Sequence, residues 1–333
     1  MTYDDEVRDT NKPAVRAEGL GKRFGATWAL RGLELDVPAG RVLGLLGHNG
    51  AGKTTAIRIL TTLTRPTEGR AQVAGFDVVA DAPRVRERIG VASQAATVDG
   101  LLTARANLEM VARLYHLAPE VARRRAGELL DRFGLAEVAD RLVKTFSGGM
   151  RRRLDLAASL VASPPVVFLD EPTTGLDPRA RAELWDVLRE RVRAGATMVL
   201  TTQYLEEADR LADEIVVLDH GAVAARGTPA ALKRAIGGDR VVVTVSSAAD
   251  VAIARAALER FADGAIAGEV EPPRVIVPTR PEARLVEVVR ALDAAGVDAH
   301  DVARREATLD DVFLVLTAPR RAAHPGAQPA GPS

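Results

Sequence analysis

The sequence contains no cysteine among its 333 residues. Disulfide bonds, a thiol nucleophile and thiolate metal sites are therefore excluded, and a reducing compartment is compatible with this composition. Aromatic residues are also scarce, at 4%. The hydrophobic core must therefore be built chiefly from alanine, valine and leucine.

The chain carries no formal net charge, because 45 basic residues balance 45 acidic ones. A basic surface is the usual electrostatic feature of nucleic-acid-binding proteins, so we expect no nucleic-acid partner. No apolar run approaches the roughly 18 residues of a membrane-spanning helix, and residues 1–11 lack the apolar core of a signal peptide. Any function at a membrane would therefore depend on a partner.

A glycine-rich segment stands out against this background, with the sequence Gly47, His48, Asn49, Gly50, Ala51, Gly52, Lys53 and Thr54. It matches the phosphate-binding loop pattern G-x-x-x-x-G-K-[ST], in which glycines let backbone amides approach phosphate oxygens. The lysine reaches the outer phosphates, and the Thr54 hydroxyl can ligate Mg²⁺. An apolar run precedes this loop and an apolar helical pattern follows it, as the motif requires.

Two acidic residues follow a second apolar run, Val166–Leu169. Such a run predicts a central strand of a parallel sheet, and its carboxyl end lies at the same edge as the phosphate-binding loop. We expect Asp170 to hold Mg²⁺, directly or through water, and Glu171 to act as a base or to orient the attacking water. Each interpretation also competes with a plain capped strand end.

Together with the loop and the two acids, three further segments give the chain a motif order that resembles the ATP-binding-cassette (ABC) ATPases. These segments are Gln94, Ser147–Gly149 and Gly175–Pro178. The resemblance covers roughly Val15 to Gly227. It implies an α/β fold of the P-loop NTPase type, with a RecA-like core, an antiparallel β subdomain and a helical subdomain.

The resemblance also implies roles for individual residues. Phe24 lies where an aromatic ring stacks on adenine, and the loop from Gly47 to Thr55 binds ATP and Mg²⁺. Gln94 corresponds to a metal ligand that senses the membrane subunit. The signature segment of the family corresponds to Ser147, Gly148 and Gly149, and it contacts the ATP bound by the other subunit of a dimer. Asp177 corresponds to a residue that links the two nucleotide sites.

The main departure from the family is Gln203, where these proteins usually have a histidine that contacts the γ-phosphate. Glutamine donates and accepts hydrogen bonds but does not titrate near neutral pH. We therefore expect hydrolysis to persist without an acid limb that depends on histidine.

Three segments narrow the resemblance: the signature Phe146–Arg153, the segment Thr201–Asp209 and the C-terminal Leu309–Leu314. They are similar to the daunorubicin/doxorubicin-resistance-type ATPases. That resemblance implies a subunit at the cytoplasmic face of the membrane, held there by a separate permease with six spans, which powers efflux of a hydrophobic drug or antibiotic.

Other classes of ABC protein match the features of this sequence less well. Translation factors of this family normally carry two cassettes, and the DNA-repair and chromosome-structuring members carry a long coiled coil or zinc cysteines. A regulatory ABC ATPase without a transport function stays open as the alternative.

The predicted domain boundaries follow from changes in composition and in the order of the expected strands and helices. We predict a disordered arm at 1–13, an ATPase domain at 14–230 whose helical subdomain spans about 95–150, an accessory domain at 238–317 and a disordered tail at 318–333. The accessory domain shows the order βαββαβ, which is typical of a ferredoxin-like fold.

Two local expectations depend on finer patterns. The segment Gly21–Gly25 predicts a turn between two strands. The pattern from Thr103 to about Phe133 is helical. The arginine run Arg123–Arg125 is interpreted as a solvent-exposed helix face.

Overall fold

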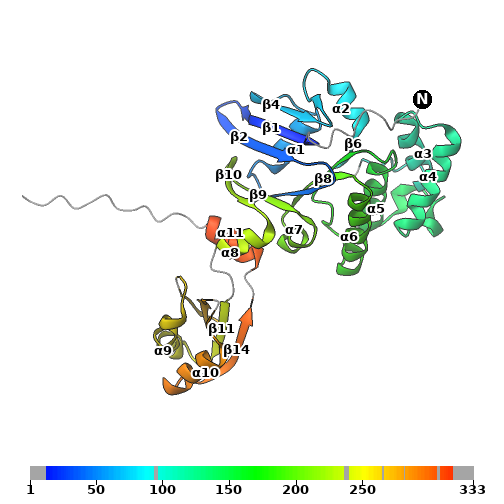
Figure 1. Ribbon diagram of the computed structural model, residues 1–333. Coiled ribbons are helices and arrows are strands. Elements are labelled where there is room, and N and C mark those ends of the chain that lie inside the picture. The colour runs from blue at the N-terminus through cyan, green and yellow to red at the C-terminus, as the bar shows by residue number, and fades with distance from the viewer. Residues whose placement is uncertain are drawn as a thin grey trace, which may run out of the picture. The chain divides into compact units, whose positions relative to one another are not determined.

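A computed structural model describes residues 13–93, 97–235, 240–264, 266–280, 282–305 and 308–317. The chain divides into two compact units, residues 1–235 and 236–333, and each contains its own sheet and helices (Figure 1). The predicted terminal arm and tail, apart from Pro13, lie outside the described residues.

The first unit alternates strands and helices along most of its length. Its strands are β1 (Val15–Phe24), β2 (Thr27–Val37), β3 (Val42–Leu46), β4 (Glu68–Val73), β5 (Phe76–Asp77), β6 (Ile89–Ala92), β7 (Val166–Asp170), β8 (Thr197–Thr202), β9 (Glu214–Asp219) and β10 (Ala222–Gly227). Its helices are α1 (Lys53–Leu60), α2 (Ala82–Arg88), α3 (Ala104–Leu114), α4 (Pro119–Arg132), α5 (Gly148–Ser159), α6 (Pro178–Arg193), α7 (Leu205–Leu211) and α8 (Pro229–Ala235).

The central sheet of this unit has six strands in the order β10-β9-β3-β8-β7-β6. All neighbours are parallel except β10, which pairs antiparallel with β9. Every residue of β3, β7 and β8 is buried, as expected for strands covered on both faces. The predicted parallel α/β sheet is confirmed, and the carboxyl ends of β3, β7 and β8 lie at one edge.

An antiparallel sheet in the order β2-β1-β4-β5 packs against the central sheet. The two share an apolar core that includes Leu20, Ile59 and Phe168, each fully buried. The predicted turn at Gly21–Gly25 is wrong in its extent. Residues 21–24 continue β1, because bulges in the register let the strand run past the glycine. Residues 22–24 pair with β2, and the chain reverses only at Gly25 and Ala26.

The helices α3, α4 and α5 lie at the right of Figure 1 and share an apolar core with β7 and β8 of the central sheet. The helical pattern predicted from Thr103 to about Phe133 is confirmed as two helices, because α3 ends at Leu114 and α4 begins at Pro119. His116, between them, has a φ of +61°, which an α-helix does not allow. Pro119 then occupies the first turn of α4, where a missing amide hydrogen costs nothing.

The second unit follows the predicted order βαββαβ. Its elements are β11 (Arg240–Val245), α9 (Ala248–Leu258), β12 (Ala267–Val270), β13 (Pro273–Pro278), α10 (Leu285–Ala294), β14 (Ala299–Arg305) and α11 (Leu309–Thr317). The strands form an antiparallel sheet in the order β12-β13-β11-β14, and valine side chains of β11 and β13 pack against α9 and α10. This is the expected ferredoxin-like arrangement.

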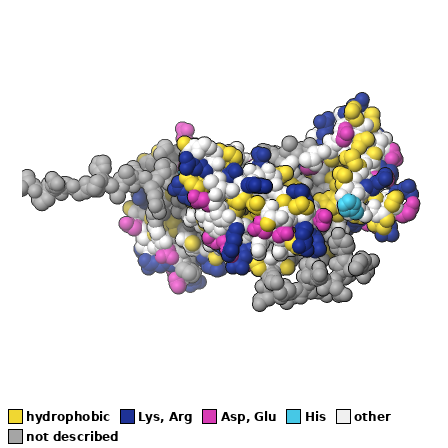
Figure 2. Space-filling view, turned by 90° about the horizontal axis from the view of Figure 1, so that it is seen from above, with side chains coloured by type: hydrophobic (Ala, Val, Ile, Leu, Met, Phe, Trp, Pro, Cys, Tyr) yellow, Lys and Arg dark blue, Asp and Glu magenta, His cyan; other side chains and the backbone are white. Residues whose placement is uncertain are grey.

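Within the part of the chain that the structure describes, no helix is both long and apolar enough to cross a membrane. Figure 2 shows basic and acidic side chains interspersed over one face, in keeping with the balanced composition. Hydrophobic side chains gather on that face over α3 and α4 (Figure 2). Leu101, Met110 and Leu114 are exposed in this region.

Candidate functional site

The glycine-rich loop joins β3 to α1 and is packed too tightly for other residues. Gly47 and Gly52 have φ values of +154° and +106°. A Cβ at Gly47 would lie 2.5 Å from the Leu218 carbonyl oxygen, and one at Gly52 would lie 2.5 Å from that of Ala29. Glycine is therefore required at both positions, and the close packing fixes the backbone shape that a phosphate needs.

Lys53 is buried at the start of α1, with 5% of its surface exposed. Its Nζ donates hydrogen bonds to the carbonyl oxygens of Gly47, at 2.7 Å, and His48, at 3.1 Å. Burial lowers the pKa of this ammonium group, and the nearby carboxylates of Glu171 and Asp170 partly oppose that shift. The loop thus holds a desolvated cation that an incoming phosphate would neutralise.

The end of β7 meets the loop through side chains. Thr54 Oγ1 donates to Asp170 Oδ2 at 3.2 Å, and the Thr201 hydroxyl donates to Asp170 Oδ1. The register of β7 against β8 places Asp170 opposite Thr201. Hydroxyl and carboxylate oxygens are the ligands that Mg²⁺ prefers, so Thr54 and Asp170 fit this ion.

Glu171 lies directly after Asp170 in an unusual backbone conformation, with a φ of +50°. Its amide donates to both the carbonyl and the hydroxyl of Thr201, each at 3.1 Å. Thr174 Oγ1 donates to Glu171 Oε2 at 3.3 Å. These bonds hold a buried carboxylate at the carboxyl edge of the parallel sheet. Strained backbone positions of this kind cluster at functional sites.

Arg152 of α5 is a site residue that the sequence reasoning missed. Its Nη2 donates to the carbonyl oxygens of Asp170 and Glu171, each at 2.7 Å, and its Nε donates to Pro172 O at 3.0 Å. A further bond runs from Nη1 to the carbonyl of Ser93. One guanidinium group therefore fixes the backbone around the candidate base.

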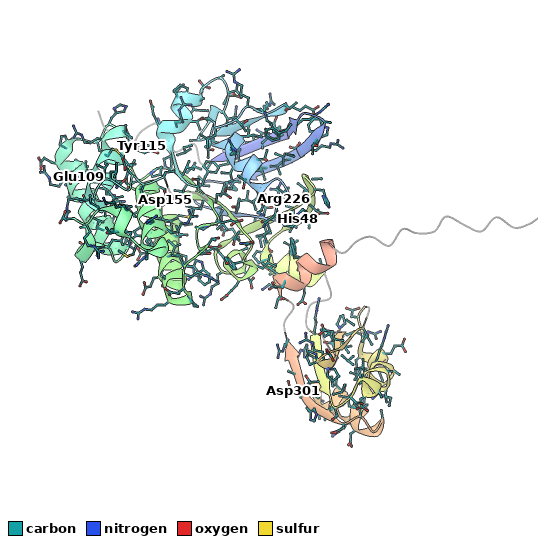
Figure 3. All side chains as sticks on the ribbon, turned by 180° about the vertical axis from the view of Figure 1, so that it is seen from behind. His48, Glu109, Tyr115, Asp155, Arg226 and Asp301 are labelled. Atoms are coloured by element: carbon teal, nitrogen blue, oxygen red, sulfur yellow. The ribbon has the colours of Figure 1, made fainter. Side chains whose placement is uncertain are left out.

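The fold also pairs Arg152 with a buried acid on the same helix. Oδ2 of Asp155, which is labelled in Figure 3, lies 3.6 Å from Nη1 of Arg152. Oδ1 of Asp155 accepts hydrogen bonds from the amide and the hydroxyl of Thr97. Burial lowers the pKa of Arg152 and raises the pKa of Asp155. An arginine and an aspartate three residues apart on an otherwise apolar helix face were the signal in the sequence.

Gln203 follows β8, which lies between β3 and β7. Its side chain is exposed at the same edge as the loop and Asp170. The topology therefore brings together the ends of three strands, which carry Lys53, Glu171 and Gln203.

The remaining loop residues differ in burial. Ala51 is fully buried, Asn49, Gly50 and Thr54 are exposed, and Thr55 is half-buried. Phe24 lies elsewhere, at the end of β1, and is 55% exposed. Lys22 Nζ approaches its ring to 5.2 Å from the centroid.

Ser147, Gly148 and Gly149 lie at the start of α5. Ser147 Oγ accepts a hydrogen bond from Met150 N at 3.2 Å and caps the helix. Asp177 likewise caps α6, since its Oδ1 accepts from Ala180 N at 2.9 Å. Among the described residues, no hydrogen bond or ion pair is found between this segment and the glycine-rich loop. Gln94 lies outside the described residues.

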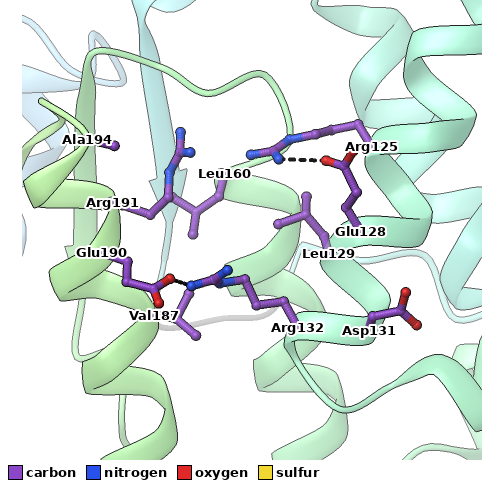
Figure 4. Close-up of a pocket in the computed structure, with 10 residues that line it drawn as sticks. All are labelled: Arg125, Glu128, Leu129, Asp131, Arg132, Leu160, Val187, Glu190, Arg191 and Ala194. Carbon is purple, nitrogen blue, oxygen red and sulfur yellow. Dashed lines mark hydrogen bonds and ion pairs between the residues drawn. The ribbon is translucent and has the colours of Figure 1, made fainter.

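A separate cavity of about 670 Å³ lies between α4 and α6 (Figure 4). Its lining combines Arg125, Arg132 and Arg191 with Glu128 and Glu190. No predicted site residue lines it. The Arg125 side chain is only 22% exposed, and it donates to Val161 O and Ser163 Oγ. The interpretation of the arginine run as a solvent-exposed face is therefore wrong for its last member.

Comparison with known proteins gives consistent matches. The ABC transporter family pattern matches residues 30–174. The daunorubicin resistance ATP-binding protein DrrA2 of Streptomyces coeruleorubidus is 52% identical over 92% of this chain and 96% of its own. The daunorubicin/doxorubicin resistance ATP-binding protein DrrA of Streptomyces peucetius is 46% identical over 91% and 92%.

Solved structures agree in fold. One is a dimeric ATP-binding cassette in a post-hydrolysis state, bound to ADP and phosphate. It is 26% identical and has a TM-score of 0.60, covering 64% of this chain and 98% of its own.

Proposed function

The chain belongs to the daunorubicin/doxorubicin-resistance-type ATP-binding proteins of ABC transporters, and we propose that its ATP hydrolysis powers efflux of a hydrophobic drug or antibiotic through a separate membrane permease. The protein is an ATPase of the ABC type. The observation that carries the assignment of the site is the hydrogen bond from Thr54 to Asp170, which joins the phosphate-binding loop to the strand that bears Glu171.

We assign nucleotide binding to the loop and Mg²⁺ binding to its oxygen ligands. Backbone amides of Gly47–Thr54 would contact the phosphates, and Lys53 would exchange its bonds to loop carbonyls for bonds to phosphate oxygens. Thr54 and Asp170 would hold Mg²⁺, together with Gln94 by family resemblance. The bound ion would supply positive charge that stabilises the negative charge of the phosphates. Phe24 offers an exposed ring for the adenine.

Glu171 is our candidate for the base that orients the attacking water. Its backbone is fixed by Thr201 and Arg152, so its position needs little adjustment during the reaction. Gln203, at the same sheet edge, would donate and accept hydrogen bonds around the γ-phosphate.

A complete site would require a second copy of the chain or a paralogous cassette. Ser147, Gly148 and Gly149 begin a helix, and helix N-termini bind anions through their amides and dipole. In the proposed dimer this segment closes the nucleotide site of the partner, and Asp177 lies in the loop between the two sites. The dimeric state of the similar cassette supports this arrangement.

The permease would place the chain at the cytoplasmic face of the membrane. The exposed apolar side chains Leu101, Met110 and Leu114 support a docking surface around α3. An apolar patch of this kind is a common feature of protein interfaces.

The test measures drug accumulation in cells that express the chain with a permease of six spans. Wild type should lower the accumulation of daunorubicin, and Lys53→Ala should abolish that effect, because the desolvated cation in the loop is lost. The matched control is Lys233→Ala, which removes a lysine paired with Asp209. Equal accumulation with wild type and Lys53→Ala would support the regulatory alternative instead.

A further inference from the structure

Three side chains converge at one edge of the phosphate-binding loop, and one of them, His48, belongs to the loop itself. His48 of the loop lies next to the turn between β9 and β10 (Figure 3). Its Nε2 is 3.1 Å from Asp219 Oδ1, and Nε2 of His220 is 3.8 Å from the same oxygen. The two imidazole rings are 5.1 Å apart between centroids. Residues 171 positions apart in the sequence therefore meet at one point.

Both ring nitrogens of His48 face oxygen atoms that accept hydrogen bonds. Nδ1 lies 2.7 Å from the carbonyl oxygen of Asn49, which only accepts. Nε2 faces the Asp219 carboxylate, which also only accepts when ionised. With Nδ1–H donating to Asn49 O, Nε2 presents a lone pair to the carboxylate oxygen, and a metal ion between these two atoms would bind both.

The cluster offers three ligand atoms that one metal ion could hold together. A proton joins two atoms, whereas three ligand atoms from His48, Asp219 and His220 lie within 4.8 Å of one another. Zinc bonds of about 2.0–2.1 Å to nitrogen and oxygen place tetrahedral ligands about 3.3 Å apart. The His220 side chain is 85% exposed, so it can close the remaining gap by rotation.

The surroundings of His48 also match a metal ligand. Metal-binding histidines usually donate their second ring N–H to a carbonyl or carboxylate, which fixes the tautomer. The contact of Nδ1 with Asn49 O supplies that interaction and directs the Nε2 lone pair toward the cluster. Two imidazoles and one carboxylate suit Zn²⁺, whereas the all-oxygen pair Thr54 and Asp170 suits Mg²⁺.

We propose that His48, Asp219 and His220 bind one Zn²⁺ ion that ties the β9–β10 turn to the phosphate-binding loop. The two segments already touch, because Gly221 N donates to Ala51 O at 3.1 Å. The turn has positive φ at His220 and Gly221, +45° and +81°, which is typical of a tight hairpin turn. Zinc would add a second link and restrain the loop that receives the nucleotide.

The experiment titrates Zn²⁺ into tag-free, chelator-treated, full-length protein without nucleotide, and measures stoichiometry by equilibrium dialysis. We expect one ion per chain and a Tm increase of about 5–10 °C at a hundredfold excess over Kd. Co²⁺ in place of Zn²⁺ should give the absorption of a tetrahedral site.

His220→Asn is the decisive variant, because asparagine tolerates the positive φ and the side chain is exposed. It should fold normally and weaken zinc binding by about 100-fold or more, as should Asp219→Asn. The matched control is His116→Asn, which replaces another exposed histidine with positive φ and should bind zinc as wild type does.

Wild-type affinity in His220→Asn, or an equal loss in His116→Asn, would overturn the proposal. Since no nucleotide is present, either result leaves the assignment of ATP hydrolysis unaffected.

Discussion

The two units of the chain are both built from a sheet and helices, yet they differ in what they bury. In the first unit the buried side chains include six that ionise: Lys53, Arg152, Asp155, Asp170, Glu171 and Glu207. In the second unit, Thr279 is the only buried polar side chain among the described residues, and the core is mostly valine, leucine and alanine.

This difference indicates where the chemistry lies. Burying a charge costs several kcal/mol unless it is paired and hydrogen-bonded. The first unit offsets that cost with bonds such as those from Arg152 to three carbonyl groups at the end of β7. The second unit has the simpler pattern of a packing or regulatory module.

The largest expected effect is at the candidate base. Glu171→Gln should lower ATP hydrolysis by about 10²–10⁴-fold, because the amide cannot accept a proton. The variant should still bind ATP and accumulate as a closed dimer, which size-exclusion chromatography would detect. The control in the second unit is Glu287→Gln, an exposed position. A normal rate for Glu171→Gln would refute the assignment.

The next effect tests the buried arginine. Arg152→Met should lower the free energy of unfolding by about 3–5 kcal/mol, because Asp155 and four carbonyl groups lose their cation. Denaturant titration measures this change. The neighbouring Arg151→Met is the control, since Arg151 is exposed and should change stability by less than about 0.5 kcal/mol. Similar losses in both variants would contradict a special role for Arg152.

A smaller effect is expected at Gln203. Gln203→Ala should lower the hydrolysis rate by about tenfold, and Gln203→His should lower it less, because histidine also forms hydrogen bonds. The histidine variant should gain an acid limb near pH 6.5 that wild type lacks, and a pH–rate profile would reveal it. An inactive Gln203→His together with a normal Gln203→Ala would exclude this role.

The smallest effect is in the second unit. Ser247 caps α9 by accepting from Asp250 N at 3.3 Å, so Ser247→Ala should cost about 1 kcal/mol of stability. Basal ATP hydrolysis should stay unchanged. A large loss of hydrolysis in this variant would show that the two units are coupled. It would contradict the conclusion that the chemistry depends on the first unit.

Much of the fold followed from sequence pattern. Apolar runs predicted the buried parallel strands, and the order βαββαβ predicted the second unit, because each pattern repeats within a few residues. The errors occurred where context outweighs pattern. Bulged pairing extended β1 through Gly21–Phe24. The left-handed His116 separates α3 from α4 within the predicted helical stretch, and no periodicity marked that break.

The sequence by itself determined the residues of the proposed nucleotide site that lie in short motifs, because phosphate and metal binding impose fixed local spacing. These residues are Lys53, Thr54, Asp170 and Glu171. Only the tertiary structure decided which side chains support them or meet beside them. Arg152 reaches carbonyl groups about twenty residues away, and His48 meets Asp219 across the sheet edge. No local spacing encodes such contacts, since they arise from the packing of strands and helices that are distant in the chain.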